Sequence, residues 1–479
     1  MNKLFKQQAY IAGKWVESSD GAVQQIFNPA DGSLLGTVPM LGAGETRMAI
    51  EAADSAKVQW AEMTAGERSA IMRRWYELMI ENADLLAEIL TLEQGKPLAE
   101  ARGEVLYGAS YIEWYAEEGK RIYGDIIPSH KKGARIVVLK QPIGVVAAIT
   151  PWNFPTSMIS RKCAPAMMAG CPFIVKPAPD TPYSALALAA LAEEAGIPPG
   201  IFNVVTGDAI AIGGEMTSND TVRKLSFTGS TNVGKILLRQ CADSVKKVSL
   251  ELGGNAPFIV FDDADIDAAV AGAIASKFRN SGQTCVCTNR FLIQSGIHDE
   301  FVDKFASAIA QIKVGNGMLQ GINQGPMINE AAVLKVEQHL ADALHKGANL
   351  ISGGKRNPIG SNFFNPTLIT DVTSEMTVAR EETFGPLAPI FRFDTEQQAI
   401  ALANDTQFGL AAYAYTKDLG RAWRVAEALE YGMVGINEGI ISNCAAPFGG
   451  IKQSGLGREG SRYGIDDYLE MKYMLLGGI

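Results

Sequence analysis

Two cysteines stand two residues apart in the segment RNSGQTCVCTNR, which spans residues 279–290. Such a pair could be half of a metal site, a redox couple, or a nucleophile with a neighbouring thiol. Zinc takes about four ligands, usually Cys and His in paired spacings. The chain has four histidines, none beside a cysteine, and no C-x2-C pair, so we expect no metal site. His339 and His345 fall in a polar helical stretch, where we expect both to face solvent.

Nucleophilic attack by Cys285 would require a thiolate and a group that takes its proton. Because histidine is scarce, a carboxylate would have to serve as the base. Glu251 in SLELGGNAPFIV is the best candidate, since it ends an apolar strand and partial burial there would raise its pKa toward neutrality. Taken alone, an ordinary strand-end glutamate in water remains the alternative.

Other polar residues also fall where apolar strands end. Asn153 lies between two prolines in TPWNFP, where a rigid amide could stabilise an oxyanion. Gly229 and Ser230 in FTGSTNVG join a strand to a helix, whose N-terminal amides would suit a pyrophosphate. Lys176 in IVKPAPDTP could reach a ribose or a phosphate, and Glu382 lies in the rigid loop EETFGP. The alternatives are a structural turn for the glycine motif and for EETFGP, and a solvated side chain for the lysine.

These residues need a scaffold that brings strand ends together. From residue 143 onward, apolar strands alternate with helical stretches, which predicts a parallel sheet covered on both faces. Ligands bind such sheets beyond the carboxyl ends of the strands. A second α/β block begins near residue 255, and helices are expected over 46–63, 64–95 and 98–118, the second opening with a Thr64–Glu67 capping box. The apolar segments 134–142 and 463–479 are expected to be strands that need partners.

The overall composition narrows the class of protein. A length of 479 residues suggests about three domains, and a net charge of −9 argues against binding nucleic acid or anionic lipid. Apolar runs stay under ten residues, well short of the ~20 that a membrane helix needs. MNKLFKQQAY shows no signal-peptide core, and six cysteines are too few for a disulfide scaffold. We expect a cytoplasmic protein with reduced thiols.

Taken in order, seven motifs resemble the aldehyde dehydrogenase family over nearly the whole chain: PWNFP, KPA, FTGSTNVG, LELGGNAPFIV, GQTC, EETFGP and PFGGIKQSGLGREG. FRNSGQTCVC and GREGSRYGIDDYLE are closest to the succinate-semialdehyde dehydrogenase branch, with glutarate-semialdehyde dehydrogenases very similar. The resemblance implies a Rossmann-type parallel-sheet cofactor domain over 1–120 and 142–252 and a second α/β catalytic domain over 253–445. It also implies a small β oligomerisation arm over 121–141 and 460–479, in a dimer or tetramer.

The resemblance also implies roles for particular residues. Cys285 would be the nucleophile, Glu251 the general base, and Asn153 with the Cys285 backbone N–H the oxyanion hole. Lys162 is near this region, and we assign it no role. The dinucleotide site would be lined by eight positions, with Glu382 on the nicotinamide ribose: Trp152, Lys176, Pro179, Gly229, Ser230, Leu252, Glu382 and Phe384.

The implied reaction is oxidation of succinate semialdehyde to succinate with NADP or NAD, through a cysteine thiohemiacetal and a thioester. Arg161, Arg279 and Ser442 resemble a clamp for the substrate carboxylate, and Phe154 and Phe448 would wall the aldehyde passage. Two surface arginines are the alternative. Glutarate semialdehyde, or another small aldehyde, is the rival substrate, since one methylene changes binding by only ~1–3 kcal/mol.

Three further points depart from or qualify the resemblance. Pro179 stands where NAD-preferring relatives carry glutamate, which favours NADP, although Asp180 could restore some repulsion. Cys287 could form a reversible lock with Cys285, but in a strand residues i and i+2 lie too far apart for an unstrained disulfide. Cys444, near Ser442, is expected to be a small filler. A thiol redox or metal-binding protein on the same fold is disfavoured by the presence of Glu251, Asn153 and Cys285 together.

Overall fold

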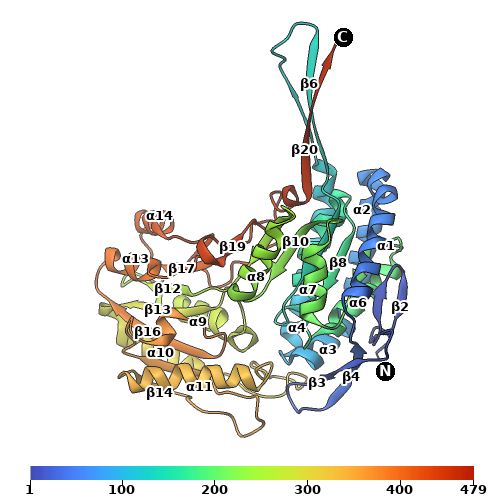
Figure 1. Cartoon of the computed structure of the whole chain (residues 1–479). Coiled ribbons are helices and arrows are strands. Elements are labelled where there is room, and N and C mark those ends of the chain that lie inside the picture. Colours follow the sequence, from blue (N-terminus) through green and yellow to red (C-terminus); the bar gives the residue numbers. More distant parts are fainter. Residues whose placement is uncertain (1) are drawn as a thin grey trace.

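The computed structural model describes residues 2–479, which form two α/β lobes and a projecting β arm (Figure 1). The first lobe is built on a sheet of eight strands in the order β19-β11-β10-β7-β8-β9-β1-β2. The central strands run parallel: β7 (Val145–Ile149), β8 (Phe173–Lys176), β9 (Phe202–Val204), β10 (Val222–Thr228) and β11 (Lys247–Glu251). The edges pair antiparallel: β1 (Ala9–Ile11) with β2 (Lys14–Val16), and β19 (Gly455–Leu456) with β11.

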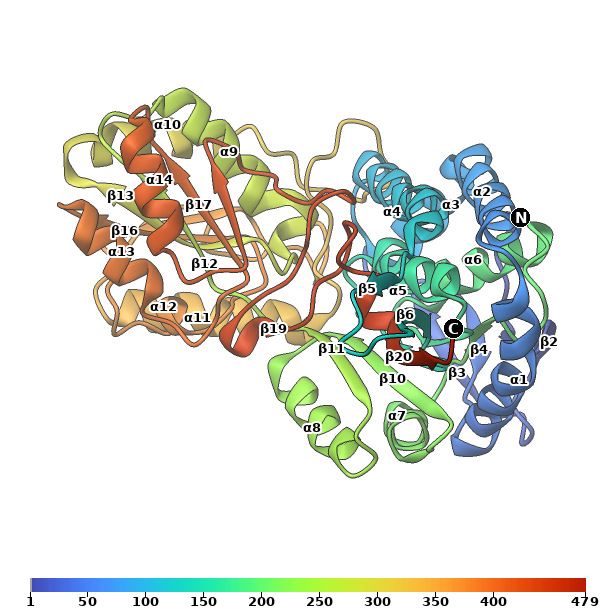
Figure 2. The same cartoon turned by 90° about the horizontal axis from the view of Figure 1, so that it is seen from above.

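Helices cover both faces of this sheet because its strands are apolar on both sides. Val145 and Ala147 pack in one core, against α1 (Ala43–Glu62), α7 (Ala209–Ser218) and α8 (Thr231–Ala242). Val146 and Ala148 face the other core, with α5 (Pro155–Ala169) and α6 (Pro182–Glu194). Outside them lie α2 (Ala65–Glu81), α3 (Ala83–Gln94) and α4 (Leu98–Glu118), which Figure 2 shows from above.

The second lobe has a seven-stranded sheet in the order β14-β15-β16-β13-β12-β17-β18. Its strands are β12 (Ala256–Val260), β13 (Thr288–Gln294), β14 (Asn349–Ser352), β15 (Thr367–Thr370), β16 (Leu387–Phe393), β17 (Ala411–Tyr415) and β18 (Met433–Ile436). One face packs against α9 (Ile266–Phe278) and α10 (His298–Ile309). The other packs against α11 (Glu330–His345), α12 (Thr377–Arg380), α13 (Glu396–Asn404) and α14 (Leu419–Ala428).

The arm is a three-stranded antiparallel sheet in the order β20-β6-β5, made of β20 (Leu469–Gly477), β6 (Ala134–Pro142) and β5 (Asp125–Ile127). It projects beyond the lobes, with the C-terminus near its tip (Figure 1). Strand β20 pairs with β6 over its whole length, so the prediction that the apolar tail pairs with another strand is confirmed. A separate hairpin joins β3 (Val23–Phe27) to β4 (Leu34–Pro39).

Several predicted elements need correction. The helix expected over 64–95 is two helices that meet at Asn82, whose side-chain amide donates to the Leu78 carbonyl at 2.8 Å and ends α2 there. The capping box at Thr64 is confirmed, since its hydroxyl accepts the Glu67 N–H. Strands β2, β3 and β4 were not predicted because their residues are largely polar, exposed or half-buried, and β1 was not predicted because it has only three residues. The expectation that His339 faces solvent is wrong: it is buried, with Nδ1 3.1 Å from the Thr383 hydroxyl.

Candidate active site

Cys285 lies where two cavities meet, between the two lobes. One cavity of about 310 Å³ and another of about 350 Å³ are both lined by this residue. It follows a short 3-10 turn, Arg279–Gly282, in which Asn280 and Ser281 have left-handed backbone angles, φ 51° and 56°. Cys285 and Cys287 therefore sit in a turn before β13, and the assumption that they lie in a strand is wrong. Both are free thiols.

The Cys285 thiol needs help to ionise. Burial raises its pKa to about 12, while the Arg161 guanidinium lowers it. The carboxylates of Glu382 and Glu251 act in the same direction as burial. A base that accepts the thiol proton is therefore required near neutral pH.

Glu251 ends β11 and lines the 350 Å³ cavity together with Cys285. Burial raises its pKa well above the ordinary value, and the nearby Glu459 raises it further, while Arg161 and Lys162 oppose both. Its Oε2 has no hydrogen-bond partner among residues 2–479. The prediction that strand-end burial raises this pKa agrees with the structure, and a raised pKa makes the carboxylate a stronger base.

Two cations and one carboxylate are buried beside Glu251. Arg161 and Lys162, adjacent on α5, both form ion pairs with Glu459, and Lys162 Nζ also donates to the Thr228 hydroxyl at 2.6 Å. The two cations hold the pKa of Glu459 below its usual value, against the effect of burial. Sequence reasoning missed Glu459, although two neighbouring cations in an apolar helix signal that a carboxylate must reach them.

Asn153 is buried in the loop between β7 and α5 and lines the 350 Å³ cavity with Cys285. Its Nδ2 donates to the Gln283 carbonyl at 3.0 Å, two residues before Cys285. An amide nitrogen carries two N–H groups, so one remains for another acceptor. The second N–H of Asn153 is therefore available in the cavity that Cys285 also lines.

Six of the eight predicted dinucleotide residues line the 350 Å³ cavity: Trp152, Gly229, Ser230, Leu252, Glu382 and Phe384. Ser230 caps α8, accepting the Val233 N–H at 3.3 Å, which leaves a helix N-terminus at the cavity. Burial raises the pKa of Glu382 to about 7, and this carboxyl accepts the Gly254 N–H at 3.1 Å. A helix N-terminus suits a pyrophosphate, and a buried carboxylate suits ribose hydroxyls, so these residues fit a nicotinamide dinucleotide.

Lys176 and Pro179 are not among the residues that line this cavity. Lys176 is buried at the end of β8, and burial lowers its pKa to about 8. The alternative of a solvated lysine is therefore wrong. Pro179 is exposed in the following loop, where its carbonyl accepts from Gln24 at 2.9 Å.

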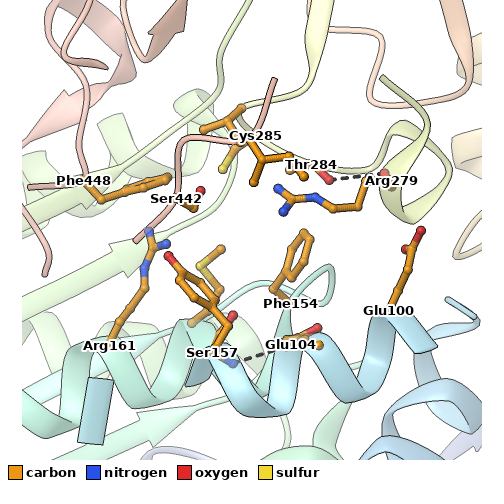
Figure 3. Close-up of a pocket in the computed structure, with 15 residues that line it drawn as sticks. Glu100, Glu104, Phe154, Ser157, Arg161, Arg279, Thr284, Cys285, Ser442 and Phe448 are labelled. Carbon is orange, nitrogen blue, oxygen red and sulfur yellow. Dashed lines mark hydrogen bonds between the residues drawn. The ribbon is translucent and has the colours of Figure 1, made fainter. Parts of the chain in front are cut away.

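The 310 Å³ cavity brings together all five predicted substrate residues: Arg161, Arg279, Ser442, Phe154 and Phe448 (Figure 3). Arg161 is only 1% exposed, and its Nη2 has no hydrogen-bond partner within the described chain. Its guanidinium lies 4.1 Å from the Phe448 ring centroid, and that of Arg279 lies 5.4 Å from the Phe154 centroid. The alternative of two surface arginines is thus wrong for Arg161.

Helix α4 supplies lining residues that the sequence did not indicate: Glu100, Glu104 and Tyr107. Cys444 is half-buried against the first core and is not among the residues that line either cavity. Cys287 is buried, with its Sγ 3.4 Å from the Lys277 carbonyl. In residues 2–479 no three His, Cys, Asp or Glu side chains are arranged to hold a metal ion, and no helix is long and apolar enough to cross a membrane.

Comparison with known proteins agrees with this geometry. The sequence model of the aldehyde dehydrogenase family matches residues 15–474. A glutarate-semialdehyde dehydrogenase of Pseudomonas aeruginosa is 62% identical over 100% of this chain and 99% of its own. The NADP(+) succinate-semialdehyde dehydrogenase of Escherichia coli is 62% identical over 99% of each chain. A crystal structure of an E. coli NADP-dependent enzyme superposes with a TM-score of 0.99 at 61% identity, covering 100% of this chain and 99% of that one.

The chain therefore belongs to the aldehyde dehydrogenase family. The predictions of this family, of its α/β fold and of aldehyde oxidation with a nicotinamide cofactor are confirmed.

Proposed function

We propose that this protein oxidises succinate semialdehyde to succinate with NADP(+). The observation that carries the proposal is the buried Arg161 guanidinium, which shares a cavity with Cys285 and has an Nη2 without a hydrogen-bond partner in residues 2–479. A buried cation with an unused donor favours an anionic group. A short aldehyde with a carboxylate at its far end would satisfy Arg161 and Arg279 while its carbonyl reaches Cys285.

The residues of the site support a covalent mechanism. Glu251 takes the proton of the Cys285 thiol, and the thiolate bonds to the aldehyde carbon. The free N–H of Asn153 and the Cys285 backbone N–H donate to the oxygen as it becomes negative, an effect worth roughly 3 kcal/mol per donor. After hydride has left the aldehyde carbon, Cys285 holds a thioester. Once Glu251 has passed its proton to solvent, it can take a proton from the water that attacks this thioester and releases the acid from Cys285.

Six residues that line the 350 Å³ cavity would hold the cofactor. Gly229 and Ser230 would bind the pyrophosphate and Glu382 the nicotinamide ribose, and Trp152, Leu252 and Phe384 would contact the nicotinamide ring. When bound, NADP(+) supplies the acceptor for the hydride that leaves the aldehyde carbon. The preference for NADP over NAD rests on Pro179, which has no carboxylate to bond the ribose hydroxyls or to repel a 2′-phosphate. The name of the E. coli relative supports the same cofactor.

Glutarate semialdehyde remains the second candidate, because a relative with that name is equally similar. Steady-state kcat/KM for the C4 and C5 semialdehydes, each with NADP(+) and NAD(+), tests the proposal. We expect the highest kcat/KM for the C4 semialdehyde with NADP(+). Its kcat/KM should be about tenfold higher than with NAD(+) and several-fold higher than that of the C5 semialdehyde. A higher value for butanal than for either semialdehyde would overturn the carboxylate assignment. Full activity in Cys285→Ala would overturn the covalent cysteine mechanism, whereas no aldehyde-dependent nicotinamide reduction by the wild type would favour the non-enzyme alternative, a thiol redox or metal-binding protein.

We also infer a homo-oligomer, a dimer or tetramer, assembled through the arm of residues 121–141 and 460–479. Exposed apolar side chains on that arm support it, among them Ile126, Met471, Tyr473 and Leu476. The division into a cofactor domain (1–120 and 142–252) and a catalytic domain (253–445) stays a prediction. So does a cytoplasmic location, which the free state of all six cysteines supports. Sedimentation velocity of the full chain measures the oligomeric state directly.

A further inference from the structure

A buried ion pair lies at the wall of the 310 Å³ cavity, which Glu104 lines, and has no part in the chemistry proposed above. Lys96 and Glu104 are both 0% exposed, and Lys96 Nζ lies 2.6 Å from Glu104 Oε2. Lys96 follows the end of α3, and Glu104 projects from α4. Buried ion pairs contribute little net stability, since desolvation offsets their attraction. The contacts of this pair indicate another role.

The lysine of the pair holds the main chain of Asn153. Lys96 Nζ donates to the Asn153 carbonyl at 2.7 Å, and Asn280 Nδ2 donates to the same oxygen at 3.0 Å. Lys96 Nζ also lies 3.7 Å from the ring centroid of Phe154, the next residue. The peptide that follows Asn153 is therefore fixed by a charged donor, a neutral donor and a ring contact.

The glutamate of the pair holds the other side of the same loop. One Glu104 oxygen accepts the Thr156 N–H at 2.9 Å and the Ser157 N–H at 3.2 Å, in the first turn of α5. Figure 3 shows Glu104 on α4 below the cavity, with the bond from Ser157 drawn as a dashed line. Lys96 and Glu104 thus hold the main chain on both sides of Phe154, at the Asn153 carbonyl and at the first turn of α5. These contacts fix the backbone from which the Asn153 side chain projects.

Asn280 connects this ion pair to the turn that carries Cys285. Its Nδ2 also donates to the Gln283 carbonyl at 3.2 Å, the atom that accepts Asn153 Nδ2 at 3.0 Å. The left-handed Asn280 is itself fixed, because its N–H donates to Glu100 at 2.8 Å and its Oδ1 accepts from Gln94 at 2.9 Å. A continuous set of hydrogen bonds therefore runs from Lys96 through Asn153 to the residues just before Cys285.

We propose that Lys96, paired with Glu104, is a positioning residue that holds the Asn153 amide toward the oxygen of the reacting aldehyde. This inference rests on the proposed role of Asn153. Lys96 does not touch the substrate, so it acts only through the loop that it fixes. A displacement of ~1 Å in such a group lowers the rate by about 10²-fold.

The test is a single-turnover measurement of nicotinamide reduction by Lys96→Met with succinate semialdehyde and NADP(+). Methionine fills a similar volume without charge. We expect the burst rate to fall by about tenfold to 100-fold, whereas Cys285 alkylation by iodoacetamide and the KM for the aldehyde change less than about threefold, because Arg161 and Glu251 stay in place. The matched control is Lys246→Met, which removes a lysine that also donates to a main-chain carbonyl at 2.7 Å, that of Asn219, far from the site. Its burst rate should equal that of the wild type.

A double-mutant cycle decides whether Lys96 acts through Asn153. In the Asn153→Ala background, Lys96→Met should slow the burst by less than about twofold more, since the two changes share one effect. An undiminished burst in Lys96→Met, or a multiplicative loss in the double variant, would overturn the inference. An undiminished burst in Asn153→Ala would instead overturn the proposed role of Asn153, and the absence of any burst in the wild type would overturn the proposed function. If Lys96→Met does not fold, Glu104→Gln, which keeps an acceptor for the Thr156 and Ser157 N–H groups, must show the same pattern.

Discussion

Replacing Glu459 by glutamine removes the carboxylate that both Arg161 and Lys162 contact, without changing the size of the side chain. All three residues are buried, so the two cations lose their partner in a region that water does not reach. Breaking a buried pair in this way costs about 3–5 kcal/mol. We expect the lower end, about 3 kcal/mol, because Glu251 lies close enough to both cations to compensate in part.

The same substitution should shift the pH dependence of the reaction. After burial, Glu459 is the next largest cause of the high pKa of Glu251. Removing the Glu459 charge lowers the pKa of Glu251 for two reasons. A like charge is lost, and Arg161 and Lys162 no longer have Glu459 as a partner, so they stabilise the Glu251 carboxylate more strongly. A base must be deprotonated to act, so the acid limb of kcat/KM against pH moves to lower pH in Glu459→Gln.

The sign of the stability change with pH follows from the pKa of Glu459. Its folded-state value is below the ordinary one, so its contribution is present above the unfolded pKa and is lost as the pH falls through the folded value. The stability difference between wild type and Glu459→Gln should therefore be largest near neutral pH and shrink in acid.

Urea denaturation and a pH profile with butanal, which lacks a carboxylate, measure the two effects separately. The control is Glu81→Gln, which breaks an exposed pair with Arg74 and should cost under about 1 kcal/mol. A stability loss below about 1 kcal/mol in Glu459→Gln would contradict the assignment of a buried triad. An acid limb that stays in place or moves to higher pH would refute the coupling of Glu251 to Glu459.

Three further outcomes can be checked. Arg279→Leu should lower kcat/KM for succinate semialdehyde about 10–100-fold, the value of a charged hydrogen bond, and leave butanal within about threefold; equal losses for both aldehydes would exclude a carboxylate contact. If Cys285 and Cys287 form a reversible disulfide, peroxide inactivation should be reversed by dithiothreitol in the wild type but not in Cys287→Ala. Identical recovery in both proteins would exclude this disulfide. Thr64→Ala removes the cap of α2 and should cost about 1 kcal/mol in urea denaturation, with unchanged kinetics; no loss would show that the Glu67 side chain caps the helix alone.

The sequence predicted well where a signal is local. Apolar strands alternating with helices define the parallel sheet around β7 and β8, and the strand ends carry Asn153 and Glu251 into one cavity with Cys285. The resemblance indicated five residues that line one cavity and that we propose to bind the substrate. The strands, the helices and the motifs at the strand ends are each defined by a few neighbouring residues. They can therefore be recognised from the sequence without knowledge of the tertiary structure.

Features that depend on distant segments were not predictable. Glu459 lies almost 300 positions after Arg161, and nothing near it indicates burial. In the sequence, Lys96 is an ordinary lysine at the end of a helix. In the structure, it is buried by its contacts with Glu104 and with the loop that contains Asn153. His339 was expected in water because its own helix is polar, yet it contacts Thr383 from a loop 44 residues away. In each case the environment of the side chain is built by another part of the chain.

Our proposal that Glu251 is the base rests on such contacts as well as on the motif around it. Glu251 and Glu459 are both buried carboxylates near Arg161 and Lys162, yet their pKa values move in opposite directions. Glu459 is contacted by both cations and stays ionised, whereas Glu251 keeps an oxygen without a partner in the described chain and meets a like charge. Only the second has a raised pKa, which favours uptake of a proton, and it is the one that shares a cavity with Cys285. The ion-paired carboxylate thus adds to the effect of burial on the pKa of the other, so the proton transfer that we propose at Cys285 would depend on a residue that does not line either cavity.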